Sequence, residues 1–122
     1  MPRIRILLVE DCVDDAELLS IELRHAGMDV ALVRVDDERC MRASLAEGIP
    51  DLVISDSNLP GFSGRQALTL VRELAPTTPF VFLSGGFDQT MQDSGIAGAA
   101  DSCLLKEDIA QMPGLIRHLL TS

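Results

Sequence analysis

The chain has 122 residues, a length that fits one domain of ordinary size. Hydrophobic residues make up 47% of it, the mean hydropathy is +0.22, and Trp and Tyr are absent, so we expect a mainly aliphatic core. The net charge of −9 argues against direct binding to nucleic acid or to an anionic membrane. The apolar runs are too short to cross a bilayer, and the first residues resemble no signal peptide.

Cysteine usage points to a reducing compartment. Cys12, Cys40 and Cys103 form no CxxC pair and leave an odd count. This pattern disfavours a disulfide framework or a zinc site, and we therefore expect reduced thiols and a cytoplasmic location.

The first half of the chain alternates apolar runs with helical patterns. The expected elements are a strand over Ile4–Val9, a helix from about Asp14 to Ala26, a second strand over Val30–Val33, and a helix that Asp36 can cap. Gly27 and Gly48 stand where the two helices are expected to stop.

The second half continues this alternation. A third strand is expected over Leu52–Ser55, and a Pro/Gly-rich loop then leads into a helix that carries Ala67, Leu70, Val71 and Leu74 at helical spacing. The later elements are strands over Phe80–Leu83 and Cys103–Leu105, a weaker helix over about Gln89–Ala97, and a last helix over Pro113–Leu120.

Five strand–helix repeats with continuous apolar strands predict a parallel sheet covered on both faces. Right-handed crossovers then give a doubly wound, three-layer α/β sandwich with five helices. The pattern alone does not fix the strand order, and the flavodoxin-like order 2-1-3-4-5 suits five strands of this length. No repeat or linker interrupts the chain, so residues 1–122 are expected to form one domain.

Polar residues follow the predicted strands at their carboxyl ends, which lie along one edge of a parallel sheet. The first strand ends in Glu10 and Asp11, the third in Asp56, the fourth in Ser84 and the fifth in Lys106. Each of these residues alone has an ordinary explanation as a cap, a turn or a solvated tip. Their expected convergence on one edge indicates a functional site.

The chemistry of these residues is coherent. Clustered carboxylates repel one another unless a cation compensates, and oxygen ligands select a hard ion such as Mg²⁺. A metal-neutralised Asp56 can attack phosphorus and form an aspartyl phosphate. Ser84 and Lys106 would then hold the transferred oxygens by a hydrogen bond and by charge.

Four segments carry a family resemblance. They are Val9-Glu10-Asp11, Asp56-Ser57-Asn58-Leu59-Pro60-Gly61-Phe62-Ser63-Gly64, Phe82-Leu83-Ser84-Gly85, and Gly98-Ala99-Ala100-Asp101 leading to Lys106. In this order they resemble the CheY-like receiver domain of bacterial two-component response regulators, and the resemblance covers essentially the whole chain.

The resemblance implies that Asp56 is the phosphoacceptor, with Ser84 as the switch hydroxyl and Lys106 as the phosphate-sensing lysine. It implies that Mg²⁺ is held by Asp11, Asp56 and the backbone carbonyl of Asn58, with Glu10 acting through water. The phosphoryl donor would be a phosphohistidine on a sensor histidine kinase or a phosphotransfer protein. Such a domain is not an enzyme beyond Mg²⁺-dependent self-phosphorylation and dephosphorylation at Asp56.

Two positions depart from the family pattern. Cys103 stands where the family usually has an aromatic residue three positions before the lysine, so the usual coupling to output is in question. Glu107 replaces the proline that usually follows the lysine, so we expect the loop over residues 107–112 to be built differently.

Alternatives stay open at this point. A Mg²⁺-dependent phosphohydrolase of the haloacid-dehalogenase type uses similar residues, but its Asp-x-Asp motif lies on the first strand, whereas here Asp56-Ser57-Asn58 follows the third. A flavodoxin would place a phosphate in the loop after the first strand, where this chain is acidic. A receiver-like docking module with unconventional output also remains. The effector and the choice between a stand-alone regulator and part of a larger protein cannot be predicted.

Overall fold

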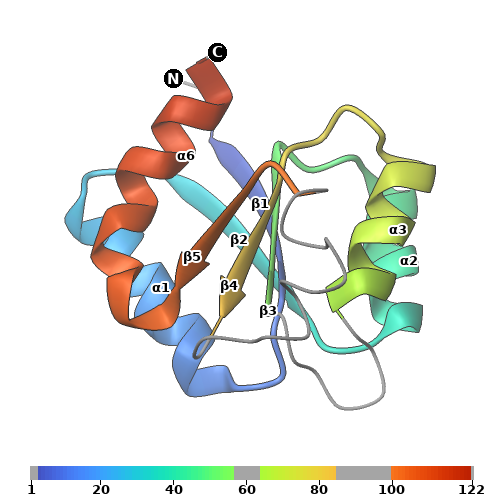
Figure 1. The fold of residues 1–122 in the computed structure, drawn as a ribbon, viewed down its shortest axis with the longest axis horizontal. Coiled ribbons are helices and arrows are strands. Elements are labelled where there is room, and N and C mark those ends of the chain that lie inside the picture. The colour runs from blue at the N-terminus through green and yellow to red at the C-terminus, as the bar shows by residue number, and fades with distance from the viewer. Residues whose placement is uncertain (1–2, 57–63, 85–99, 122) are drawn as a thin grey trace.

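Five strands form the centre of the protein, and helices cover both of their faces (Figure 1). The computed structural model describes residues 3–56, 64–84 and 100–121. The strands are β1 (Ile4–Val9), β2 (Val30–Val35), β3 (Leu52–Asp56), β4 (Phe80–Ser84) and β5 (Ser102–Leu105). The α-helices are α1 (Val13–His25), α2 (Glu38–Glu47), α3 (Gly64–Leu74) and α6 (Met112–Thr121), and a 3₁₀ helix, η1, spans Lys106–Gln111.

All neighbouring strands pair in parallel, in the order β2-β1-β3-β4-β5. This confirms the flavodoxin-like doubly wound sheet. The described residues contain four α-helices, and the predicted helix over residues 89–97 lies outside them. The difference in helix count leaves the fold class unchanged.

Alternation along the strands divides the core into two layers. On β1, Leu7 and Val9 face the layer shared with α2 and α3, whereas Ile6 and Leu8 face the layer shared with α1 and α6. Figure 1 shows these helix pairs on opposite sides of the sheet. Since both faces are covered, the central strands are apolar along most of their length, which explains the continuous apolar runs in the sequence.

The end of α1 is fixed by a glycine, as predicted. Gly27 has a φ of +77°, a conformation that L side chains rarely adopt. Its N–H donates to the carbonyl of Arg24 at 3.0 Å, and the N–H of Met28 donates to the carbonyl of Leu23 at 3.1 Å. These two bonds form the Schellman motif that closes a helix.

The predicted cap of α2 was wrong by one residue. Asp37, rather than Asp36, is the N-cap, and its Oδ1 accepts a hydrogen bond from the backbone N–H of Cys40 at 2.7 Å. Both aspartates are good capping residues. The helix begins at Glu38, so Asp37 has the extended backbone and the reach that capping requires.

The other predicted boundaries agree with the structure to within two residues. β2 extends to Val35, and α6 begins at Met112, which leaves Pro113 in the first turn of the helix as expected. The chain after β5 forms η1 directly, so Lys106 stands at a junction between a strand and a 3₁₀ helix.

Candidate functional site

The carboxyl edge of the sheet gathers the polar residues that the sequence placed at the strand ends. Glu10 directly follows β1, Asp56 ends β3, Ser84 ends β4 and Lys106 directly follows β5. These four strands are neighbours in the sheet. Parallel pairing therefore brings together residues that lie far apart in the sequence.

Three carboxylates form a compact group, which we call the carboxylate group: Glu10, Asp11 and Asp56. Each offers one oxygen atom, and these atoms all lie within 4.8 Å of one another. Glu10 and Asp56 are buried, with 1% and 7% of their surface exposed, while Asp11 is exposed. Asn58, the fourth predicted metal ligand, lies outside the described residues.

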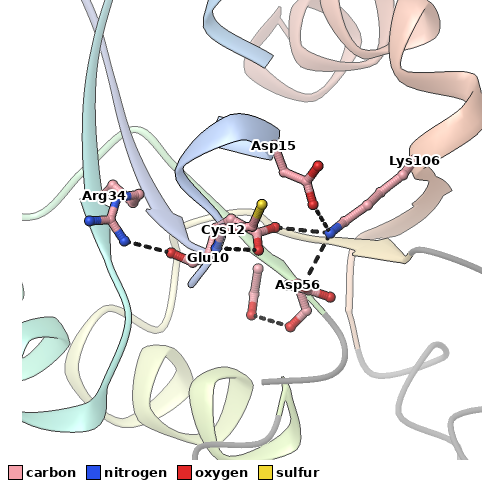
Figure 2. Close-up of polar contacts among 7 residues, drawn as sticks. Glu10, Cys12, Asp15, Arg34, Asp56 and Lys106 are labelled. Carbon is pink, nitrogen blue, oxygen red and sulfur yellow. Dashed lines mark hydrogen bonds and ion pairs between the residues drawn. The ribbon is translucent and has the colours of Figure 1, made fainter. Parts of the chain in front are cut away.

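Lys106, the first residue of η1, reaches this group from the end of β5. Its Nζ lies 3.2 Å from Oδ2 of Asp56 and 3.2 Å from Oε2 of Glu10. A third contact, to Oδ2 of Asp15 in the first turn of α1, is the shortest at 2.6 Å. Figure 2 shows the ammonium between these three side chains.

Glu10 is held in place mainly through its backbone and one carboxylate oxygen. Its N–H donates to the carbonyl of Val35 at 2.9 Å, and its carbonyl accepts from Nη1 of Arg34 at 3.0 Å. Its Oε1 accepts a hydrogen bond from the N–H of Cys12 at 3.1 Å (Figure 2). These contacts fix the carboxylate at the end of β1.

The second oxygen of Glu10 is the observation that bears on a metal. Within the described parts of the chain, the buried Oε2 has no hydrogen bond in good geometry, although the Lys106 ammonium stands nearby as an ion-pair partner. Burying this oxygen is costly, and the Lys106 ammonium 3.2 Å away offsets part of that cost. An oxygen-only donor set with such an atom fits a hard divalent cation such as Mg²⁺.

The surroundings of the site raise the pKa values of both Glu10 and Lys106. Burial raises the pKa of Glu10 to about 7, and the nearby Asp56 adds to this, while the Cys12 N–H and Lys106 oppose it. Burial by itself lowers the pKa of Lys106, but the contacts with the carboxylates of Asp15, Glu10 and Asp56 outweigh this effect and raise that pKa. The lysine therefore remains a cation and Glu10 can take up a proton near neutral pH.

Ser84 lies at the end of β4, next to Asp56 on the neighbouring strand β3. It is buried, and it follows Leu83, the register partner of Asp56. The carbonyl oxygen of Asp56 accepts a hydrogen bond from Oγ of Ser55 at 2.9 Å. Cys103, which replaces the usual aromatic residue, is exposed on β5.

Asp15 is a partner of Lys106 that was not predicted from the sequence. The sequence does place Asp15 near the site, because it lies in the first turn of the helix that directly follows Glu10 and Asp11. What distinguishes Asp15 from its exposed neighbour Asp14 is the contact with Lys106, which forms only in the folded chain.

Fold and site together define a class: flavodoxin-like α/β domains with a cation-competent acidic site at the carboxyl edge of the sheet. Within this class, the sequence matches the response regulator receiver domain over residues 6–117, and the chain belongs to that family.

Relatives and solved structures agree with this assignment. The chain is 35% identical over 104 residues to the DNA-binding response regulator MtrA of Mycolicibacterium paratuberculosis, covering 85% of this chain and 45% of MtrA. It is 29% identical over 119 residues to the cell cycle transcriptional regulator CtrA of Caulobacter vibrioides, covering 93% and 51%. The chain thus spans about half the length of these curated relatives.

Among solved structures, the signal receiver domain of an HD domain-containing protein from Pseudomonas fluorescens Pf-5 superposes with a TM-score of 0.85 at 26% identity. The match covers 99% of this chain and 89% of that one.

Family membership decides between the functional classes that the sequence left open. The chain is a receiver domain, the phosphoacceptor module of two-component systems, rather than a conventional enzyme or a flavodoxin. Receiver domains generally bind Mg²⁺ at an acidic pocket, and the carboxylate group consists of acidic residues that could hold such an ion. No helix in the described ranges is long and apolar enough to cross a membrane.

Proposed function

We propose that Asp56 accepts a phosphoryl group from a phosphohistidine of a sensor histidine kinase or a phosphotransfer protein. The observation that carries this proposal is the placement of Asp56, a buried carboxylate at the end of a central strand with the Lys106 ammonium 3.2 Å away. Burying a carboxylate is costly, and membership of the receiver family supplies a functional reason for its position.

Glu10, Asp11 and Asp56 would hold Mg²⁺, with Glu10 acting through water and Asn58 contributing its backbone carbonyl. The described part of this set, the carboxylate group, supports the assignment by its oxygen-only chemistry and its close spacing. When bound, Mg²⁺ would neutralise the clustered carboxylates and the charge on the transferred oxygens.

The transfer step requires a nucleophile and a stabilised leaving group. An oxygen of the Asp56 carboxylate attacks phosphorus, and a P–O bond forms as the P–N bond to the donor imidazole breaks. The imidazole leaves with the electron pair and takes up a proton. Lys106 and Ser84 would hold the phosphoryl oxygens, the lysine by charge and the hydroxyl by a hydrogen bond.

The same residues give the domain its own Mg²⁺-dependent phosphorylation by small donors and its own dephosphorylation at Asp56. Output would pass to a downstream partner through a conformational change that begins at Ser84 and Lys106. Direct binding to nucleic acid or a membrane is not part of the proposal, since the chain carries a net charge of −9. Because the chain belongs to the receiver family, we also propose that it acts in the cytoplasm.

The test is intact-mass analysis after incubation with acetyl phosphate and MgCl₂. We expect one added phosphoryl group on the wild type and none on Asp56→Asn. Asp14→Asn is the matched control, because it removes one carboxylate from an exposed position of the same acidic run. We expect this control to be phosphorylated like the wild type.

Two results would contradict the proposal. Wild type that gains no mass with Mg²⁺ present, or Asp56→Asn that gains as much as the wild type, would exclude Asp56 as the acceptor. Repeated turnover of a phosphate ester by the wild type would instead favour a phosphohydrolase.

A further inference from the structure

Lys106 makes three carboxylate contacts of two kinds. Two of them are to members of the carboxylate group, Glu10 and Asp56, each at 3.2 Å. The third is to Asp15, which lies outside that group, on the first turn of α1. At 2.6 Å it is the shortest of the three, and it is a side-chain hydrogen bond as well as an ion pair.

Asp15 and Lys106 both lie at the boundary between the site and solvent. Their side chains are 34% and 23% exposed, whereas that of Glu10 is 1% exposed. The ammonium is therefore drawn toward the rim of the site by Asp15 and inward by Glu10 and Asp56. Figure 2 shows Asp15 and Asp56 on different sides of the lysine nitrogen.

This geometry sets up a competition for oxygen atoms. A divalent cation bound by the carboxylate group needs oxygen atoms of Asp56 and, through water, of Glu10, and Lys106 lies 3.2 Å from one oxygen of each of these two residues. An ammonium that lost Asp15 would satisfy its N–H groups with those oxygens instead. It would then compete with the metal more strongly, both for ligands and by like-charge repulsion.

We propose that Asp15 is a positioning residue that acts through Lys106: it holds the ammonium at the rim so that the carboxylate group stays available to a divalent cation. The inference rests on the proposed function, because it concerns the metal site named there. Asp15 itself is not a metal ligand in this proposal. Its effect on metal affinity passes through the lysine.

The experiment measures the Kd for Mg²⁺ by isothermal titration calorimetry on four proteins: wild type, Asp15→Asn, Lys106→Gln and the double variant. We expect Asp15→Asn to raise the Kd about tenfold, at the lower end of the range for residues that orient a metal site from outside it. Lys106→Gln lowers the Kd, because a competitor is removed. In the Lys106→Gln background, Asp15→Asn no longer changes the Kd appreciably.

Asp14→Asn is the matched control, since Asp14 is exposed in the same turn and the substitution removes the same charge. If the effect came only from the removed charge, Asp14→Asn and Asp15→Asn would lose Mg²⁺ affinity to a similar extent. Asp15→Asn would then also lose the same affinity in the wild type and in the Lys106→Gln background. Either of those results would overturn the proposal, as would an unchanged Kd in Asp15→Asn.

A second readout needs no metal. In the metal-free protein, the side-chain ammonium resonances of Lys106 in an NMR spectrum should move in Asp15→Asn and stay in place in Asp14→Asn. Unmoved resonances in Asp15→Asn would also overturn the proposal. A wild type that binds Mg²⁺ but takes no phosphoryl group from acetyl phosphate overturns the proposed function alone, so the two failures are distinguishable.

Discussion

Glu10 is a buried carboxylate whose protonation is tied to folding. Burial is the main cause that raises its pKa to about 7, against an ordinary value of 4.5, and Asp56 contributes in the same direction. The Cys12 N–H and Lys106 only partly offset these effects. The folded protein therefore retains a proton over a pH range in which the unfolded chain has released it.

The sign of the resulting pH dependence follows from linkage. Because the folded state binds more protons between pH 4.5 and about 7, Glu10 stabilises the fold at low pH, and this stabilisation is lost as the pH rises through the window. We predict that the Tm of the metal-free wild type falls more steeply between pH 5 and pH 7.5 than the Tm of Glu10→Gln.

Thermal unfolding in EDTA across this pH range checks the prediction, and the difference between the two proteins isolates Glu10 from the other carboxylates. Equal pH slopes for wild type and Glu10→Gln would show that the Glu10 pKa is not raised in the folded state.

At the scale of elements, two glycines allow the same substitution to be made in two different backbone conformations, one left-handed and one helical. Gly27 ends α1 with a φ of +77°, while Gly114 lies inside α6. An added Cβ would meet no atom within 4 Å at either position. Packing is thus equal, and only the backbone conformation differs.

We predict opposite signs for the two alanine substitutions. Gly27→Ala should lower the free energy of unfolding by about 1–2 kcal/mol, because an L side chain is strained at positive φ. Gly114→Ala should raise it by roughly 0.5–1 kcal/mol through helix propensity and a less flexible unfolded chain. Urea unfolding measures both, and a destabilising Gly114→Ala or a neutral Gly27→Ala would contradict the backbone explanation.

Element boundaries show where sequence reasoning reached its limit. Gly27 could be predicted as a helix stop because few residues tolerate its conformation. The cap of α2 could not be settled between Asp36 and Asp37, since both have the right chemistry and the choice depends on where the first turn closes. The Asp15 contact was hidden for a related reason: a lysine 91 residues away selects it.

At the scale of the whole molecule, the site was predictable because topology creates it. Continuous apolar strands indicated a parallel sheet with two covered faces, and a parallel sheet places all its carboxyl ends on one edge. Glu10, Asp56, Ser84 and Lys106 could therefore be grouped without any knowledge of distances. Apolar periodicity carries no information on which strands are neighbours, so the order 2-1-3-4-5 was predicted by analogy with flavodoxin-like sheets of five strands.

The same topology couples the site to global stability, since the carboxylate group exists only when β1 and β3 are paired. A cation that binds this group binds the folded state alone, and at about a hundredfold excess over its Kd it would stabilise the fold by about 2.7 kcal/mol. We predict that MgCl₂ raises the Tm of the wild type above its value in EDTA. Asp11→Asn should lose most of this rise, because exposed Asp11 can be replaced without disturbing the core.

Differential scanning calorimetry in MgCl₂, with NaCl at matched ionic strength as the reference, measures the effect, and Asp14→Asn serves as the charge-matched control. General screening of an acidic chain would raise the Tm in NaCl as well and would act alike on both variants. An equal Mg²⁺-dependent rise in wild type and Asp11→Asn would place the cation elsewhere. If Mg²⁺ raises the Tm only in proteins that keep Asp11, the stability of the whole sheet depends on the cation that neutralises the carboxylates at its carboxyl edge.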